Sequence, residues 1–308
     1  MMRRSVLATL LCLAVHGMCA AAPKSAEHQF GVIGHNFGQG GGEAQLEQAL
    51  SKLHKPQLAF VLATGLKSAN EPCSDTLYAH RRDMLASSQP PIIVTPAASD
   101  WADCKNSAGR MAGNERLNRL RELLYAEPAE QDAKPVMVVR QSANAKFRSY
   151  AENAHWTTGK VLYATVNIPS NNNHYRAEAG RNSEFEDRVV ANRFWISRLF
   201  ALAKRKKLDA LVLFSEGNIK VLGEEPGLLA QLGRGSTQDG FVLPRRQIVA
   251  LAAQFEGKVL LIDTAPLVPG KEPAITWRGN LGHVSVGAHA VQVHVTPKSD
   301  TLFTLEQP

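Results

Sequence analysis

Four side chains able to bind metal or exchange protons each follow a predicted strand: His35, Asp100, Glu216 and Asp263. Ligands of open α/β sheets bind just beyond the carboxyl ends of the strands, so these four groups could converge. Imidazole and carboxylate are common zinc ligands, and three or four of them can hold one ion. The sequence therefore allows a site for one divalent metal, Zn²⁺ or Mn²⁺. The alternative is that each group is a solvated or hydrogen-bonded loop residue.

Motifs for nucleophilic catalysis and phosphate binding have little support. Ser99 stands beside Asp100, but the chain contains no Gly-x-Ser-x-Gly nucleophile elbow. Residues 38–42 read Gly-Gln-Gly-Gly-Gly and precede a predicted helix, as a phosphate-binding loop would. They lack the Lys and the Ser or Thr of a P-loop, so we expect a flexible connector there. No catalytic residue is assigned from these motifs.

Alternating strands and helices must position these groups. Apolar runs predict strands over 30–34, 58–63, 92–95, 136–140, 161–168, 208–214 and 258–263. Helices are expected over 43–54, from Ser74, from Asn114, from the Ser183-x-x-Glu186 capping box, and over 244–255. The alternation at 291–295 and the run 301–305 predict antiparallel strands. This order predicts a layered α/β fold in which two sheets pack together.

Three further stretches are expected to be irregular. His155-Trp156 and the polar run 171–174 are interpreted as surface loops, with a position in the cleft as the alternative. Residues 217–240 contain six glycines and Pro226, which predicts a loop rather than a strand or helix.

The N-terminus has the pattern of a secretory signal. Arg3 and Arg4 precede an apolar stretch over 5–15, and small residues at 19–22 suit cleavage. We expect residues 1–21 to be a signal peptide and residues 22–308 to form a single periplasmic or secreted domain. The apolar stretch is too short to cross a bilayer. No later stretch is long and apolar enough either, so no membrane span is expected in the mature chain.

The cysteines and the charge limit the partners further. Removal of the signal leaves Cys73 and Cys104, which an oxidising compartment would join in a disulfide; two free buried thiols are the alternative. The formal net charge is +7, and the basic run 204–207 supplies much of it at the end of a predicted helix. Positive charge there complements the helix dipole. Because no aromatic residues interleave this run, a nucleic-acid partner is not expected.

The loops after the first three strands resemble those of the metallophosphoesterase (calcineurin-like) superfamily, in particular a secreted bacterial branch. The matching segments are Leu66-Lys67-Ser68, Glu71-Pro72-Cys73-Ser74-Asp75, Thr95-Pro96, Trp101-Ala102-Asp103-Cys104 and Ser170-Asn171-Asn172-Asn173. Members of the family place Asp, Gly-Asp and Gly-Asn motifs after these strands, and His motifs after later ones. The resemblance covers most of the mature chain and is loose after residue 215. It implies an α/β fold that is a layered α/β/β/α sandwich of two mixed sheets flanked by helices.

The departures from the family fall on its metal ligands. His35 stands at the first Asp, Leu66 at the Asp that bridges both metals, and Ala98-Ser99 at the third motif. The segment after the middle strand, Ser215-Glu216-Gly217-Asn218, contains no His, and Asp263-Thr264-Ala265 replaces the late His motif. Two-metal hydrolysis needs lone-pair ligands around two cations, and Leu66 would place an alkyl group where ions sit. We therefore expect a catalytically inactive pseudoenzyme that has no cofactor and binds an unknown envelope component. A phosphoesterase rebuilt around one metal is the alternative.

Overall fold

The computed structural model describes residues 27–37, 42–126, 136–177, 182–223, 238–297, 299 and 301–308. The expected signal peptide, residues 1–21, lies outside these ranges, as does most of the expected loop over 217–240.

A five-stranded sheet is built from the two ends of the chain. Its order is β12-β11-β1-β2-β3. The strands β1 (His28–Ile33), β2 (Leu58–Thr64) and β3 (Ile92–Thr95) run parallel. The C-terminal strands β11 (Ala290–Val295) and β12 (Phe303–Glu306) add antiparallel partners beside β1. The expected antiparallel tail is therefore confirmed.

The middle of the chain forms a seven-stranded sheet of order β4-β5-β6-β7-β8-β10-β9. Its parallel centre consists of β6 (Val161–Thr165), β7 (Ala210–Phe214), β8 (Lys258–Asp263) and β10 (Leu281–Ser285). Antiparallel strands extend it on both sides: β4 (Val139–Arg140), β5 (Ala154–Thr158) and β9 (Thr276–Arg278).

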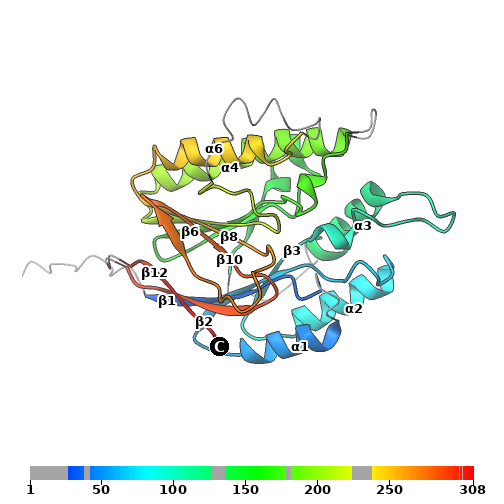
Figure 1. Cartoon of the computed structure of the whole chain (residues 1–308), viewed down its shortest axis with the longest axis horizontal. Coiled ribbons are helices and arrows are strands. Elements are labelled where there is room, and N and C mark those ends of the chain that lie inside the picture. Colours follow the sequence, from blue (N-terminus) through cyan, green and yellow to red (C-terminus); the bar gives the residue numbers. More distant parts are fainter. Residues whose placement is uncertain are drawn as a thin grey trace, which may run out of the picture.

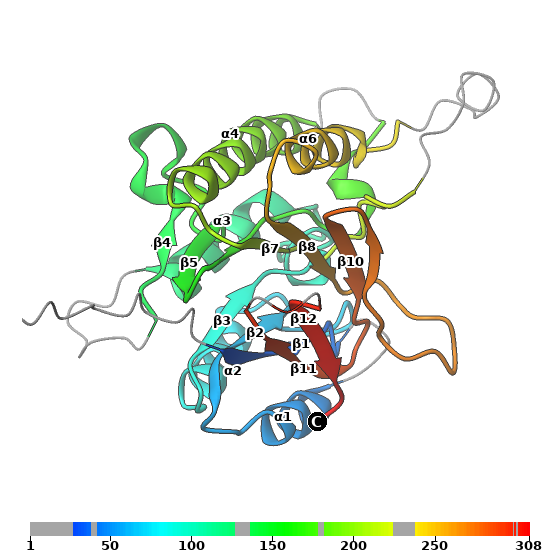
Figure 2. The ribbon, with the colours of Figure 1, turned by 90° about the vertical axis from the view of Figure 1, so that its left-hand side faces the viewer.

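Helices cover the outer face of each sheet (Figures 1 and 2). The helices α1 (Glu43–Lys52), α2 (Asp75–Ala86) and α3 (Gly113–Tyr125) share a core with the five-stranded sheet. The helices α4 (Ser183–Arg205) and α6 (Val242–Ala252) share one with the seven-stranded sheet. The predicted α/β/β/α sandwich of two mixed sheets is thus confirmed. None of the described helices is both long and apolar enough to cross a bilayer.

Aromatic side chains hold the inner faces of the two sheets together. Phe30 and Phe60 from one sheet meet Tyr163 and Phe214 from the other, with ring centroids 4.9–6.0 Å apart across the interface. Aromatic pairs of this kind add to the free energy gained from apolar burial. Trp156 completes the cluster, 5.1 Å from Phe60. This packing fixes the two sheets face to face.

Several local predictions are wrong. His155 and Trp156 were expected in a surface loop, yet both are buried in β5. The third helix begins at Gly113 with Ala112 as its cap, so Asn114 lies one position inside it. The helix α4 is capped by Asn182, whose carbonyl oxygen accepts the backbone N–H of Glu186. Strands β9 and β10 were not predicted at all.

Candidate functional site

The loops after β1, β3 and β7 meet at one edge of the sandwich and bring His35, Ser99, Asp100 and Glu216 together. Three hydrogen bonds or close contacts link residues far apart in the sequence: Ser99 with His35, Ala98 with Glu216, and His35 with Glu216. The carboxyl ends of the parallel strands of both sheets therefore lie at the same edge of the sandwich, where an α/β fold is expected to hold a ligand site.

Asp100 is fully buried and organises the loops after β2 and β3. Its Oδ1 atom accepts the backbone N–H groups of Leu66 and Lys67 at 2.9 and 3.1 Å, and Oδ2 accepts that of Ala97 at 2.8 Å. Burial raises the pKa of Asp100 to about 6, although these three hydrogen bonds oppose the shift. The carboxylate thus acts as a structural acceptor that joins two loops.

Glu216 connects the two sheets. Its Oε2 atom accepts the backbone N–H of Ala98 at 2.6 Å and that of Ser170 at 3.0 Å, and Oε1 accepts the Ser170 hydroxyl at 2.8 Å. The side chain is 3% exposed, and burial raises its pKa to about 7 against these hydrogen bonds. Ala98 follows β3 in one sheet, whereas Ser170 and Glu216 follow β6 and β7 in the other.

His35 lies between Ser99 and Glu216. Its Nε2 atom is 3.0 Å from the Ser99 hydroxyl, and its Nδ1 atom is 3.8 Å from Oε1 of Glu216. Burial lowers the pKa of His35 to about 4, and the positive charge of Lys67 adds to the effect. The imidazole is therefore neutral near pH 7.

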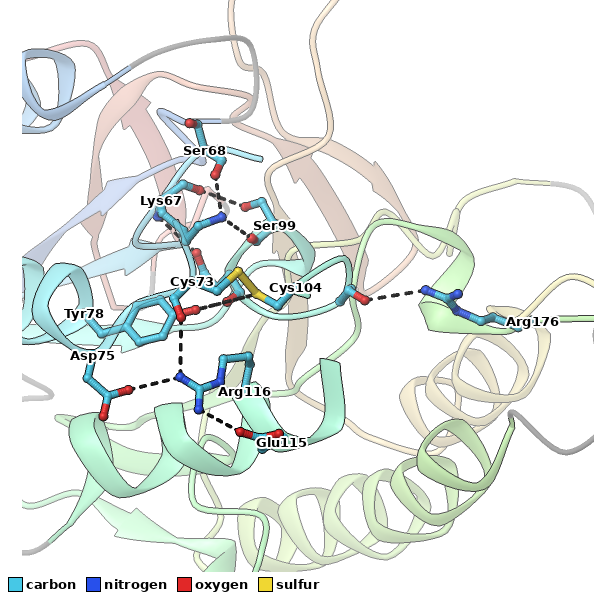
Figure 3. Close-up of a disulfide and its surroundings, with 12 residues drawn as sticks. Lys67, Ser68, Cys73, Asp75, Tyr78, Ser99, Cys104, Glu115, Arg116 and Arg176 are labelled. Atoms are coloured by element: carbon cyan, nitrogen blue, oxygen red, sulfur yellow. Dashed lines mark hydrogen bonds and ion pairs between the residues drawn. A yellow bond between two sulfur atoms is a disulfide. The ribbon is translucent and has the colours of Figure 1, made fainter. Parts of the chain in front are cut away.

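Lys67 contributes an ammonium group to the same loops (Figure 3). The side chain is 1% exposed, and Nζ donates to the carbonyl oxygens of Ser68 and Ser99 at 2.6 and 2.9 Å. Burial lowers the pKa of Lys67, while the charge of Asp100 opposes this shift. Lysine is seldom buried unless it is paired with an acidic group. The sequence around Lys67 gave no indication that this residue belongs to the site.

A disulfide fastens the two loops that carry Lys67 and Ser99 (Figure 3). Cys73 and Cys104 are bonded, 31 positions apart in the chain, which confirms the predicted pairing. The hydroxyl of Tyr78 donates to the carbonyl oxygen of Asp100 at 2.7 Å beside the bridge. The backbone around Asp100 is thus held covalently and by hydrogen bonds.

The loop after β6 contains a left-handed turn at the rim of the cleft. Asn172, Asn173 and His174 have φ values of 55°, 54° and 54°. Such angles are unfavourable for residues with a Cβ atom and require support from the surroundings. Arg188, fully buried on α4, supplies it by donating to the carbonyl oxygen of Asn173 at 2.8 Å. Gly240 also contributes, because its N–H donates to Asn172 Oδ1 at 2.9 Å.

Asp263 does not join this group through its side chain. Along β8, Leu261 packs in the core beneath α4 and α6, and Asp263 follows two positions later on the same face. Its carboxylate lies 2.6 Å from His283 Nε2 and accepts the hydroxyl of Ser285 at 2.7 Å. Only the neighbouring backbone reaches the cleft, where Thr264 N–H donates to the carbonyl oxygen of Glu216 at 3.2 Å.

Leu66 and Ala98 lie beside the cleft, but their side chains belong to a hydrophobic core. Both pack in the cluster between the five-stranded sheet and helices α1 to α3, and Leu66 is fully buried. The Leu66 alkyl group is therefore part of the core. Its backbone N–H nevertheless serves the site as a donor to Asp100.

Within the described ranges, no group of three or more His, Cys, Asp or Glu side chains is arranged to hold a metal ion. No family model matches the chain, and no curated protein is significantly similar to it. The site is consequently characterised by its own contacts: two buried carboxylates, a neutral imidazole, a half-buried serine and a buried ammonium.

Proposed function

We propose that this chain is an exported protein of metallophosphoesterase-like architecture that is inactive as a metal-dependent phosphoesterase. We propose further that its cleft, or the rim of the cleft, binds another component of the bacterial envelope. The layered fold and the likeness of the loops around Cys73 and Cys104 support the family assignment. The signal-like N-terminus and the disulfide are compatible with export.

One observation carries the proposal: all four carboxylate oxygens of Asp100 and Glu216 already accept hydrogen bonds from the protein. Six such bonds are present, with donor–acceptor distances of 2.6–3.1 Å. A metal ion bound to these oxygens would compete with these donors, four of which are buried backbone N–H groups, and each buried donor left unsatisfied would cost about 1–3 kcal/mol.

The buried ammonium of Lys67 supports the same reading. A dinuclear site supplies positive charge that balances its carboxylates, whereas here a covalently attached cation lies beside Asp100 and stabilises its ionised form. A lysine in these loops would repel a divalent cation placed close to it. The local charge balance thus favours a cleft that works without metal.

Elemental analysis combined with an activity assay tests the proposal. The mature protein, purified without chelator, should contain no stoichiometric Zn or Mn. It should also fail to hydrolyse bis-p-nitrophenyl phosphate or p-nitrophenyl phosphate when Mn²⁺ or Zn²⁺ is added. Stoichiometric metal together with turnover that disappears in Asp100→Ala would refute the proposal and establish the one-metal phosphoesterase.

The binding role is tested at the rim. Ser170 and Asn171 are exposed there, and Asn218 is partly exposed. Substituting Asn171→Arg and Asn218→Arg should remove a specific partner from affinity purifications of an envelope extract. The exposed substitution Lys160→Ala, at the opposite end of β6, should leave recovery unchanged. Equal recovery with all variants would rule out the rim as the binding surface.

A further inference from the structure

We propose that Ser99, His35 and Glu216 form a metal-independent acyl-transfer site that accepts small carboxylic esters. The inference goes beyond the proposed loss of phosphoester hydrolysis, because it concerns a different reaction and needs no metal. The carboxylate of Asp100 has no part in it beyond holding the loops.

The three side chains stand in the order that nucleophilic catalysis by serine requires. The Ser99 hydroxyl is 3.0 Å from His35 Nε2, and His35 Nδ1 is 3.8 Å from Glu216 Oε1. A nucleophile within hydrogen-bonding distance of a base, with an acid beside the other ring nitrogen, is the general signature of this chemistry. The second distance is longer than a hydrogen bond, and catalytic hydrogen bonds are often long before substrate binds.

The acid and the imidazole are each held in place by groups outside the relay. Three donors from Ala98 and Ser170 fix the Glu216 carboxylate. The imidazole packs against Gly65, where an added Cβ atom would stand 2.6 Å from His35 Cδ2. Gly65 also has a φ of 78°, a value suited to glycine. The residue after β2 thus leaves the space that the ring occupies.

The nucleophile is reachable from solvent, but only narrowly. Ser99 is half-buried, and the side chain of His35 is 11% exposed. This limited access favours small acyl groups. In the ground state the hydroxyl of Ser99 donates to the carbonyl oxygen of Lys67 at 2.9 Å. The hydroxyl must turn from that acceptor to His35 Nε2 before it can attack.

The reaction is balanced with water as the second substrate. Ser99 Oγ bonds to the acyl carbon while its proton passes to His35 Nε2, and His35 then protonates the departing alcohol as the ester C–O bond breaks. Water then attacks the acyl-serine and gives a proton to His35. As the bond between the acyl carbon and Ser99 Oγ breaks, His35 returns that proton to Oγ, and the carboxylic acid leaves. Glu216 stabilises the imidazolium in both halves. Lys67 Nζ donates to the backbone carbonyl oxygen of Ser99 at 2.9 Å, so a positive charge lies in the loop that carries the nucleophile.

A fluorophosphonate probe tests the site, because it reacts with activated serine hydroxyls and releases fluoride. The mature protein, in EDTA, should label with one probe per chain at Ser99, as mapped by peptide mass spectrometry, and should hydrolyse p-nitrophenyl acetate. The variants Ser99→Ala and His35→Gln should each lower the labelling rate at least 100-fold. The exposed serine substitution Ser87→Ala should leave it unchanged.

Two further variants guard against a trivial loss of structure. Ser99→Cys keeps the shape of the side chain and should react with iodoacetamide at position 99 faster than the same variant carrying His35→Gln. Gly65→Ala should slow fluorophosphonate labelling while the far-ultraviolet circular dichroism is retained. Absence of labelling in the folded wild type, or labelling that persists in Ser99→Ala, would overturn the inference. Neither result bears on metal content, so the proposed loss of phosphoesterase activity is tested separately.

Discussion

The carboxylate of Glu216 accepts the backbone N–H of Ala98 at 2.6 Å and so joins the two sheets of the sandwich at the edge where their parallel strands end. The residues lie 118 positions apart in the chain. A hydrogen bond to a charged acceptor is shorter and stronger than one between neutral groups. The side chain of Glu216 therefore holds together the loops that follow β3 and β7.

Glu216→Gln should change how stability depends on pH. The pKa of Glu216 is raised from 4.5 in the unfolded chain to about 7 in the folded protein. Protonated Glu216 therefore contributes at most about 3 kcal/mol to the free energy of unfolding. This contribution is fully present below pH 4.5 and is lost as the pH rises through 7. Glutamine keeps the hydrogen-bonding shape without ionising. Urea unfolding between pH 4.5 and 8 should show the wild type losing stability relative to Glu216→Gln, and parallel curves would contradict this account.

Replacing His155 should make the protein more resistant to acid. Burial lowers the pKa of His155 from 6.5 to about 4, with the charges of Arg198 and Lys206 adding to the shift. Below pH 6.5 this histidine is protonated in the unfolded chain but stays neutral in the folded protein. The free energy of unfolding therefore decreases as the pH falls from 6.5 to 4, by up to about 3 kcal/mol. Nδ1 of His155 has no hydrogen-bond partner in the described structure. His155→Phe should flatten this part of the thermal-unfolding profile, whereas the exposed substitution His54→Gln should not.

Removing the disulfide should loosen the candidate site as well as the fold. Cys73→Ser combined with Cys104→Ser releases a loop closed over 31 positions, which should cost roughly 3 kcal/mol in the free energy of unfolding. Amide hydrogen exchange should increase in the loops after β2 and β3 more than in β7 and β8. Uniform acceleration across both sheets would show that the bridge stabilises the whole domain and not these loops in particular.

Leu66→Asp should not create a metal site. The side chain lies in the core beneath α1 to α3, so an aspartate there would be buried close to the Asp100 carboxylate. We expect a loss of at least about 3 kcal/mol and no gain of metal. Leu66→Met, which conserves volume, should cost less than about 1.5 kcal/mol. A stable Leu66→Asp protein that binds one Mn²⁺ per chain would show that the loop can turn this side chain into the cleft.

The sequence predicted the buried strands well where apolar residues are continuous. The strand β8 begins and ends at Lys258 and Asp263 as expected, and β3 likewise spans Ile92 to Thr95. The strand β10 was not predicted, because His283 and Ser285 interrupt its apolar pattern. Both side chains are satisfied by Asp263 on the adjacent strand, a contact that local periodicity does not contain.

The candidate site was predictable only in part. Strand-end position correctly indicated that His35, Asp100 and Glu216 lie close together, but the same rule included Asp263, whose side chain points to the other face. Alternation within β8 decides that direction, and an error of one residue reverses it. Lys67 and Ser170 were not identified as site residues, because their roles depend on partners 32 and 46 positions away.

The left-handed turn of residues 172–174 determines what binding at the rim would cost. Arg188 and Gly240 hold this turn in one conformation before any partner arrives. A partner that contacts it therefore meets a preorganised surface and loses little conformational entropy on association. Affinity at this rim would come from shape complementarity between the partner and a rigid turn, and not from a loop that folds on binding.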